Sequence, residues 1–446
     1  MDIHPVTATQ TILQRLHDYE SPNVTFIEPD GSWPIVWERA QGVHVWDNTG
    51  KKYLDLTAAF GVAAAGHANP RVVRAGQTQM GTLLHAMGDV HPHARKAELA
   101  RELSGLTFER WTGQQRGKVI FSNSGFEAVE SALKTAMLAT KRQGIIAFAG
   151  AYHGLGYGVL NATHREHFRA PFRSQLREFG HFVPFPLAAE GSGKKVRNTE
   201  TLAQTEAAIR SIFRREKIGA ILVEPIQARG GTNVPPAGFL PLLRQLCDEH
   251  GALLILDEIY TGFGRTGKWF ACEHSGTVPD LICLGKALTG GFPLSACVGR
   301  ADLMDAAWPV TTGEAIHTST YLGHPVGCAM ALAQIQEIKK SKLPDRAATL
   351  GESLLKQLAA MRLPQGKVRH TVRGKGLMVG VELTLPDGLP ATHIALDAIK
   401  SLLHRGYIFL PEGEHGNIIS FTPPLIITPA QLTRAVKALT NVLATA

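Results

Sequence analysis

One lysine, Lys286, stands after the apolar run Leu281 to Leu284 with a single glycine between them. Upstream, the apolar run Ala252 to Leu256 ends in two carboxylates, Asp257 and Glu258. Short apolar runs of this kind are typical of buried strands, so an amine and an acid are each expected at a strand end. A lysine placed there can form a Schiff base with a carbonyl compound. A buried acid beside it completes a chemical pair.

Two more strand ends carry residues with chemical potential. In the segment Phe121 to Ala128 a strand ends, small polar residues and a glycine follow, and a helix begins. Free backbone N–H groups and the helix dipole suit a phosphate there, although a plain turn with Ser124 as N-cap explains the same pattern. After the next strand, Tyr152 and His153 precede Gly154, and the aromatic ring can stack on a planar ligand. A structural Tyr-His pair is the alternative.

Together, the four strand ends offer a phosphate site, an aromatic face, a carboxylate and a lysine. Pyridoxal phosphate requires this set: the lysine forms the imine, and the acid keeps the pyridine nitrogen protonated so that the ring can accept electrons. Taken singly, Lys286 can be a lysine that extends from a strand end to water. Asp257 can be a helix cap or part of a surface salt bridge. Their common order and spacing favour the cofactor.

A glycine pattern from Gly262 to Gly267 competes with this interpretation, because it matches the loops that bind dinucleotides. In those loops the glycines follow the strand directly and a helix opens on them, whereas here Asp257 to Thr261 intervene. A nicotinamide site is therefore disfavoured. A metal site is also disfavoured, since no Cys or His spacing suggests zinc and no carboxylate-rich motif accompanies the histidines His85, His91 and His93.

The elements that position these residues follow from short apolar runs alternating with helical patterns. This alternation predicts an α/β fold with a parallel sheet covered by helices, in which ligands bind outside the carboxyl ends of the strands. The predicted strands are Lys118 to Phe121, Gly144 to Phe148, Ala220 to Val223, Ala252 to Leu256 and Leu281 to Leu284. Glu127 to Thr140 and Pro241 to His250 are the predicted crossover helices.

Three regions are predicted: residues 1–60, which join a small domain, a large domain at 61–335, and a smaller C-terminal α+β domain at 336–446. In the last region the pattern predicts a helix at 347–361, a strand at 376–383 and a helix at 393–404. A final helix begins with Thr428 at the N-cap, Pro429 next and Gln431 in the position of a capping box. Residues 190–195 read as an inserted loop.

The composition indicates a globular enzyme rather than a basic nucleic-acid-binding segment or a membrane protein. The chain has 446 residues, 44% of them hydrophobic, and a formal charge of +8 that no basic run concentrates, so no nucleic-acid partner is expected. Five cysteines without CxxC spacing fit a reducing cytoplasm. Neither a signal peptide nor a membrane span is expected.

The ordered landmarks resemble those of the class III pyridoxal-phosphate aminotransferases of fold type I, which include the acetylornithine, 4-aminobutyrate and ω-amino acid transaminases. The resemblance covers nearly the whole chain. Its motifs are the segments at 123–128, 152–154, 224–227, 257–262, 285–287 and 320–325.

The resemblance implies a role for each matched residue. Lys286 resembles the Schiff-base lysine that then moves a proton between the substrate Cα and the cofactor, and Glu224 resembles a second acid close by. Thr320 resembles a threonine that reaches the phosphate of the neighbouring subunit, which implies a homodimer with shared sites. The implied cofactor-binding residues are Ser124, Gly125, Phe126, Tyr152, His153, Asp257, Ile259, Tyr260, Lys286 and Thr320.

Several positions depart from the family pattern. Phe126 and Tyr260 stand where a small residue and a glutamine are usual, and a phenol can also donate to the cofactor's ring oxygen. Leu155 and Ser420 stand where many relatives carry carboxylate-binding arginines. We therefore expect Arg229 either to have taken over carboxylate recognition or to point to solvent. Phe60 is a further expected substrate contact.

The predicted activity is transfer of an amino group from an amine or amino acid to a 2-oxo acid by two half-reactions. The two missing arginines favour a small acceptor such as pyruvate over 2-oxoglutarate. A racemase or epimerase on the same scaffold is the second hypothesis, because the same lysine can exchange the Cα proton without transfer. A non-catalytic cofactor-binding protein ranks lower, since the matched residues are intact.

Overall fold

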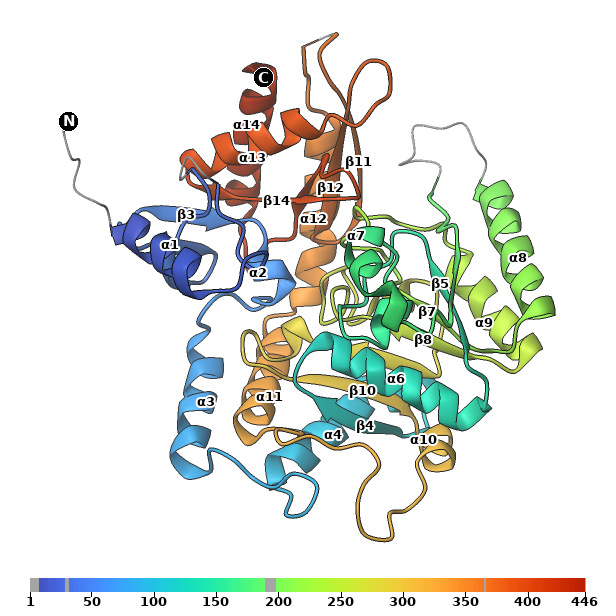
Figure 1. Cartoon of the computed structure of the whole chain (residues 1–446). Coiled ribbons are helices and arrows are strands. Elements are labelled where there is room, and N and C mark those ends of the chain that lie inside the picture. Colours follow the sequence, from blue (N-terminus) through green and yellow to red (C-terminus); the bar gives the residue numbers. More distant parts are fainter. Residues whose placement is uncertain (1–7, 29–31, 189–197, 365, 446) are drawn as a thin grey trace.

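The computed structural model describes residues 8–28, 32–188, 198–364 and 366–445 (Figure 1). Within these ranges a seven-stranded sheet has the order β4-β10-β9-β8-β7-β5-β6. The strands are β4 (Gly117–Ser122), β5 (Gly144–Phe148), β6 (Gly180–Val183), β7 (Ile218–Val223), β8 (Leu253–Asp257), β9 (Leu281–Leu284) and β10 (Ser295–Arg300). From β9 to β6 all neighbours are parallel. The five predicted strands and the mostly parallel sheet are thus confirmed.

Two strands of this sheet, β6 and β10, were absent from the sequence prediction. β10 pairs antiparallel with both β9 and β4 and so separates them. Its segment, Ser-Ala-Cys-Val-Gly-Arg, has only small and polar residues around one valine, so it lacks the pattern of a buried strand. β10 also helps to position the candidate site, because Ser295 Oγ donates a hydrogen bond to the Ser124 carbonyl at 2.6 Å.

The two faces of the sheet bury alternate residues of each strand, as a pleated strand requires. On one face, α6 (Gly125–Thr140) shares a core with Ile255 and Cys283, and on the other, α9 (Phe239–His250) packs with Leu254 and Leu256. Both predicted crossover helices are confirmed. Because each strand is covered on both sides, the carboxyl ends of the strands and the loops that follow them remain for ligand contacts.

The C-terminal region follows α11 (Pro325–Lys340) and lies beside the N-terminal strands at the top of Figure 1. It contains α12 (Leu343–Ala359), α13 (Thr392–His404), α14 (Pro429–Thr445) and a sheet of β11 (Arg369–Lys375), β12 (Met378–Thr384), β15 (Ile418–Phe421) and β14 (Leu410–Glu412). The capping box of α14 is present, since Gln431 Oε1 accepts from the Thr428 N–H at 2.9 Å. The predicted helices and the strand of this region are confirmed.

A second four-stranded sheet joins the two ends of the chain. Its order is β1 (Trp37–Gln41), β2 (His44–Asp47), β3 (Lys52–Asp55) and β13 (Tyr407–Ile408), and β3 runs parallel to β13. This pairing supports the prediction that residues 1–60 join the small domain, and the domain boundaries stay a prediction. The inserted loop predicted at 190–195 lies outside the described residues.

The remaining helices surround these sheets. They are α1 (Ala8–Tyr19), α2 (Ala58–Gly61), α3 (Pro70–Thr82), α4 (Ala94–Leu106), α5 (Phe108–Thr112), α7 (Glu166–Arg169), α8 (Asn198–Arg215) and α10 (Ala301–Ala307).

The glycine pattern from Gly262 to Gly267 forms turns and opens no helix. A Cβ at Gly267 would lie 2.9 Å from the Ala348 Cβ of α12, so the glycine permits close packing against that helix. Between these glycines, buried Arg265 donates through Nη1 to the carbonyls of Leu377 (3.0 Å) and Pro423 (2.6 Å). The segment therefore fastens the loop after β8 to the C-terminal region, which explains its glycines without a dinucleotide.

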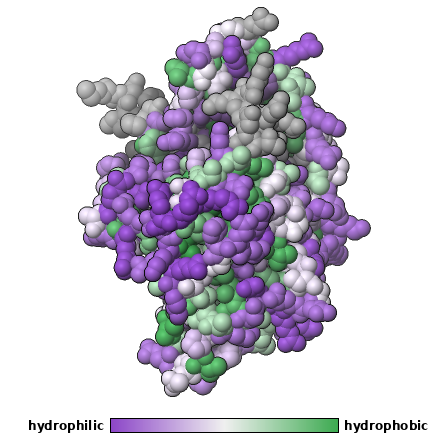
Figure 2. All heavy atoms as spheres, turned by 90° about the vertical axis from the view of Figure 1, so that its right-hand side faces the viewer, coloured by the Kyte–Doolittle hydropathy of each residue, from purple (hydrophilic) through white to green (hydrophobic). Residues whose placement is uncertain are grey.

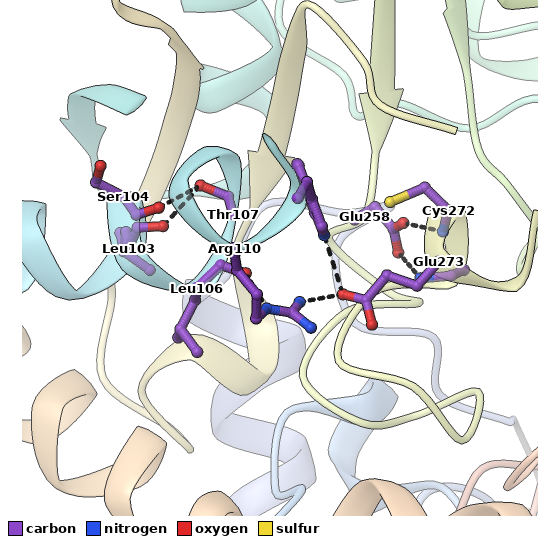
Figure 3. A network of polar contacts seen from close by, with 10 residues as sticks. Leu103, Ser104, Leu106, Thr107, Arg110, Glu258, Cys272 and Glu273 are labelled. Atoms are coloured by element: carbon purple, nitrogen blue, oxygen red, sulfur yellow. Dashed lines mark hydrogen bonds and ion pairs between the residues drawn. The ribbon is translucent and has the colours of Figure 1, made fainter. Parts of the chain in front are cut away.

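Among the described residues Glu258, the first residue after β8, shares no side-chain hydrogen-bond partner with Asp257. It is fully buried and accepts hydrogen bonds from the N–H groups of Ala271 (2.9 Å) and Cys272 (2.8 Å) and from the Thr261 hydroxyl. Figure 3 shows the contact with Cys272 and the neighbouring pair of Arg110 and Glu273. Glu258 therefore holds the start of the 3-10 helix Ala271–His274 in place.

Replacing Glu258 with alanine is expected to lower the free energy of unfolding by roughly 2–4 kcal/mol, because two buried N–H groups lose their acceptor. Urea denaturation of the purified variant measures this loss. Glu216→Ala, at an exposed glutamate, is the matched control. Equal midpoints for the two variants would contradict the structural role of Glu258.

The surface is mostly hydrophilic on the face that carries α8, with hydrophobic residues scattered between polar ones (Figure 2). No helix in the described part of the chain has both the length and the apolar character of a membrane span. Among the same residues, no group of three His, Cys, Asp or Glu side chains is placed to hold a metal ion.

Candidate active site

The carboxyl ends of β4, β5, β7, β8 and β9 surround a cavity of about 380 Å³. The predicted residues that line it are Ser124, Gly125, Phe126, Tyr152, His153, Glu224, Arg229, Asp257, Ile259, Tyr260 and Lys286, joined by Gly154, Leu155 and Ala228. Five segments that are distant in sequence therefore meet at one sheet edge, as strands running in the same direction require.

Two predicted site residues, Thr320 and Phe60, do not line this cavity. Thr320 is exposed in the loop before α11, and Phe60, in α2, is 47% exposed. The contact of Thr320 was expected from a neighbouring subunit, so the single chain does not test it. Both roles stay predictions.

Lys286 presents its amine to the cavity. Its Nζ lies 4.2 Å from the centroid of the Tyr260 ring and makes no hydrogen bond with the residues that the structure describes. Burial lowers the pKa of the lysine, while the carboxylates of Asp257, Glu224 and Glu412 oppose this shift. An amine with a lowered pKa loses its proton more readily than a surface lysine does, and is therefore a better nucleophile at a given pH.

Asp257, which is 5% exposed, is oriented by its neighbours. Its Oδ2 lies 2.8 Å from His153 Nδ1, and its Oδ1 accepts from the Ile259 N–H at 3.1 Å. The other ring nitrogen, His153 Nε2, is buried and has no hydrogen-bond partner among the described residues. His153 thus orients the Asp257 carboxylate, a role that the Tyr-His pattern in the sequence did not show.

Glu224, at the end of β7, is a second buried acid beside Asp257. It accepts hydrogen bonds from the N–H groups of Tyr152 (3.0 Å) and Ala228 (3.1 Å). Burial raises its pKa to about 7, His153 opposes this rise, and Asp257 adds to it. Glu224 therefore joins two of the loops that carry site residues and can exchange a proton near neutral pH.

The start of α6 has the geometry of an anion site. Ser124 is its N-cap, and Glu127 Oε2 accepts from the Ser124 N–H at 2.7 Å. The first N–H groups of the helix have no acceptor within it. A Cβ at Gly125 would lie 3.0 Å from Ile259 Cδ1, so the glycine leaves room between the helix start and Ile259. The N-cap is thus confirmed and is compatible with phosphate binding.

Phe126 packs against the glycine-rich loop that carries Leu155. A Cβ at Gly154 would lie 2.4 Å from the Phe126 Cβ, and a Cβ at Gly156 would lie 2.6 Å from Cδ2 of the ring. The unusual phenylalanine is therefore accommodated by glycines on the facing loop. It also places Leu155, 46% exposed, at the cavity as an apolar wall.

Gly156→Ala is expected to lower the free energy of unfolding by roughly 1–3 kcal/mol, because the added methyl group overlaps the Phe126 ring. Adding Phe126→Ala should recover most of this loss. Urea denaturation of the single and double variants measures both effects, with Gly105→Ala, which meets no atom within 4 Å, as control. Strictly additive losses would disprove the contact.

Arg229 and Tyr260 contact neighbours that the sequence did not indicate. Arg229 lines the cavity, with its Cζ 5.2 Å from the centroid of the Tyr152 ring and its Nε 3.7 Å from Glu412 Oε2. Arg229 thus lies at the cavity wall with its side chain 35% exposed, and its role in carboxylate recognition stays a prediction. The Tyr260 hydroxyl lies 3.3 Å from Thr422 Oγ1, so its ring rather than its hydroxyl faces Lys286.

Glu412 was missed by sequence reasoning. It is a lone acid in β14 between apolar residues and a glycine, and no spacing connects it with the other site residues. Its link to the cavity depends on how the C-terminal sheet packs beside the loop after β7.

Comparisons with known proteins show which family has this sequence and this arrangement of site residues. Residues 27–443 match the family model of class III aminotransferases. The chain is 36% identical to the 5-aminovalerate aminotransferase of Pseudomonas aeruginosa, over 91% of this chain and 92% of that protein. It is 34% identical to the 4-aminobutyrate aminotransferase of Escherichia coli, over 92% and 93%.

The chain belongs to the class III aminotransferases. A solved amine transaminase from an uncultivated Pseudomonas species, in its pyridoxal-phosphate-bound form, matches with a TM-score of 0.86 and 30% identity, covering 95% of this chain and 98% of that one. The fold is therefore that of fold type I, the cofactor is pyridoxal phosphate, and the activity is amino-group transfer. The names of these relatives support the aminotransferase and not the racemase hypothesis.

Proposed function

We propose that this aminotransferase moves an amino group from an amine or amino acid to a 2-oxo acid in the cavity around Lys286. Lys286 is the covalent anchor of the cofactor and the base that moves the proton at the substrate Cα. The observation that carries this proposal is the Lys286 amine, which faces the cavity with a lowered pKa and makes no hydrogen bond to the part of the chain that the structure describes.

The residues present fit pyridoxal phosphate. Gly125 leaves the space beside Ile259 that a Cβ would fill, the start of α6 offers N–H groups to a phosphate, and Tyr152 supplies a ring. Asp257, held by His153, is the acid proposed for the pyridine nitrogen. When bound, the cofactor supplies an aldehyde that condenses with amines and a ring that accepts the electron pair of a deprotonated carbon.

The proposed acceptor is a small 2-oxo acid such as pyruvate. Leu155, at the cavity, offers no charge to a second carboxylate, and Ser420 is buried in β15. Steady-state rates for a panel of amino donors, each with pyruvate and with 2-oxoglutarate, test this preference. A higher kcat/KM for 2-oxoglutarate across the panel would reject it.

The pH dependence of cofactor attachment is predicted from Lys286. Because its pKa lies below the ordinary 10.5, the neutral amine is populated at lower pH than in a surface lysine. The rate of attachment to the apoprotein should therefore rise with pH and level off below pH 10.5. Pyridoxal, which lacks the titrating phosphate, is the suitable probe, followed by absorbance after mixing. A rate still rising at pH 10.5 would contradict the lowered pKa.

A homodimer with shared sites is also part of the proposal, with Thr320 of each chain serving the cavity of the other. Its exposure on the loop before α11 supports this role. Mixed dimers of Thr320→Ala and Lys286→Ala chains test it. If Thr320 serves the cavity of the other chain, each mixed dimer keeps one complete site, whereas it keeps none if Thr320 serves the cavity of its own chain. Sedimentation of the wild type as a monomer would reject the dimer.

The cytoplasm stays the proposed location. All five cysteines are buried and unpaired, as a reducing compartment permits. Detection of the tagged protein in fractionated cells tests this placement.

A further inference from the structure

Tyr260 places the face of its ring beside the amine of Lys286. The Nζ atom lies 4.2 Å from the ring centroid, within the range over which the negative face of an aromatic ring attracts a cation. The same amine makes no hydrogen bond with the residues that the structure describes. A buried cation without a polar partner is costly, so the ring face is the contact available to stabilise the protonated amine here.

The phenol end of Tyr260 is bonded to another part of the chain. Its hydroxyl lies 3.3 Å from Thr422 Oγ1, and Thr422 Oγ1 donates to the Thr57 carbonyl, also at 3.3 Å. Because a hydroxyl group has one proton to donate, Thr422 accepts from Tyr260 and the phenol is the donor of that pair. The phenol proton is therefore used in this chain of hydrogen bonds, and the ring face is what Tyr260 offers to Lys286.

Packing fixes the orientation of the ring. Tyr260 is buried in a small apolar cluster with Ile226, Ala228 and Met378. On another side, a Cβ at Gly61 would lie 3.2 Å from Cε1 of the ring, so the glycine allows α2 to approach it closely. Side chains and backbone from several separate segments therefore hold the ring, and the face that meets the amine is preorganised.

Charged groups from other segments also act on the amine. They are the carboxylates of Asp257, Glu224 and Glu412 and the guanidinium group of Arg229. Burial has the largest effect and lowers the pKa of Lys286, the carboxylates oppose this change, and the guanidinium group adds to it. Tyr260 itself is neutral, since burial raises its pKa to about 12. A substitution of Tyr260 therefore changes the ring contact and leaves these charges in place.

We propose that Tyr260 is a positioning residue of this aminotransferase, and that the face of its ring holds the protonated amine of Lys286 whenever the amine is not bonded to the cofactor. As the base at Cα, Lys286 carries the proton between its removal and its delivery, and a ring face attracts this charged form. A glutamine, which is usual at this position in the family, has no such face. The inference rests on the proposed function, which assigns the proton transfer to Lys286.

The pH dependence of the Lys286 amine tests the contact. The rate of pyridoxal attachment to the cofactor-free protein is measured against pH, and the midpoint of this profile reports the loss of the amine proton. Tyr260→Leu removes the ring, so the protonated amine loses its stabilisation and the midpoint should fall by roughly one pH unit. Tyr260→Phe keeps the ring and should leave the midpoint unchanged. Tyr19→Leu, at a tyrosine that is 89% exposed, is the matched control and should also leave it unchanged.

Steady-state kinetics of the cofactor-loaded variants give a second measurement. Tyr260→Leu should lower kcat about tenfold while the KM of the donor stays within about twofold, because the change affects proton transfer rather than binding. Tyr260→Phe should restore kcat. If Tyr260→Leu does not fold, Tyr260→Gln also removes the ring and should shift the midpoint in the same direction.

Two results overturn the proposal: a wild-type midpoint in the variant without the ring, or a midpoint in Tyr260→Phe that falls as far as in that variant. Borohydride trapping on Lys286 reports the proposed function separately. No adduct in the wild type would reject the proposed function, whereas an adduct together with an unshifted midpoint rejects only the role of Tyr260.

Discussion

Replacement of Lys286 with alanine is expected to lower kcat by about ten-thousandfold or more, because in the proposed mechanism one side chain supplies both the covalent anchor and the base at Cα. The variant should still fold, since its amine makes no hydrogen bond with the described residues. Assays of amino transfer with the best donor and acceptor measure the loss.

Borohydride reduction followed by peptide mass analysis provides the second measurement. The wild type should carry a pyridoxyl group on Lys286, and Lys286→Ala should carry none. Lys268→Ala, on the loop after β8, is a control that should keep both the adduct and the activity. An adduct on another lysine of the wild type would reject the assignment of the anchor.

Replacement of Asp257 with asparagine is expected to lower kcat by about 10²–10³-fold, since its carboxylate is the proposed preorganised charge beside the cofactor. Asparagine keeps the size of the side chain and can still accept from the Ile259 N–H, so the loss reports charge rather than packing. Borohydride should still trap the cofactor on Lys286 in this variant.

Comparison with a variant of Glu224 distinguishes the effect of Asp257 on kcat from that of its neighbour. Glu224→Gln should lower kcat less, because Glu224 is bonded to two backbone N–H groups and has a pKa raised to about 7 by burial. If Asp257→Asn retained wild-type kcat, the proposed partner of the pyridine nitrogen would be wrong.

Most of the sheet and the cofactor side of the cavity could be predicted from the sequence. The apolar runs that end at Asp257 and near Lys286 are long enough to be recognised as strands, and parallel strands place their following residues at one edge. The same local segments therefore specify both the strands and the candidate site residues at their ends. For that reason the residues that line the cofactor side of the cavity could be predicted together.

The substrate side could not be predicted in the same way. Glu412 meets Arg229 through the packing of β14 beside the loop after β7, and a lone glutamate has no local pattern that reveals such a contact. β10 was missed because small residues can form a buried strand without an apolar run. The packing of Phe126 depends on Gly154 and Gly156, whose role becomes visible only when the two loops face each other.

Arg265 restricts the mechanics of this enzyme. One buried guanidinium group joins the loop after β8 to two carbonyls of the C-terminal region, at Leu377 and Pro423, and the Leu377 N–H donates back to the Arg265 carbonyl. A hinge at this junction would have to break several charge-assisted hydrogen bonds in a water-free interior. The junction therefore opposes rotation of the C-terminal region about this point.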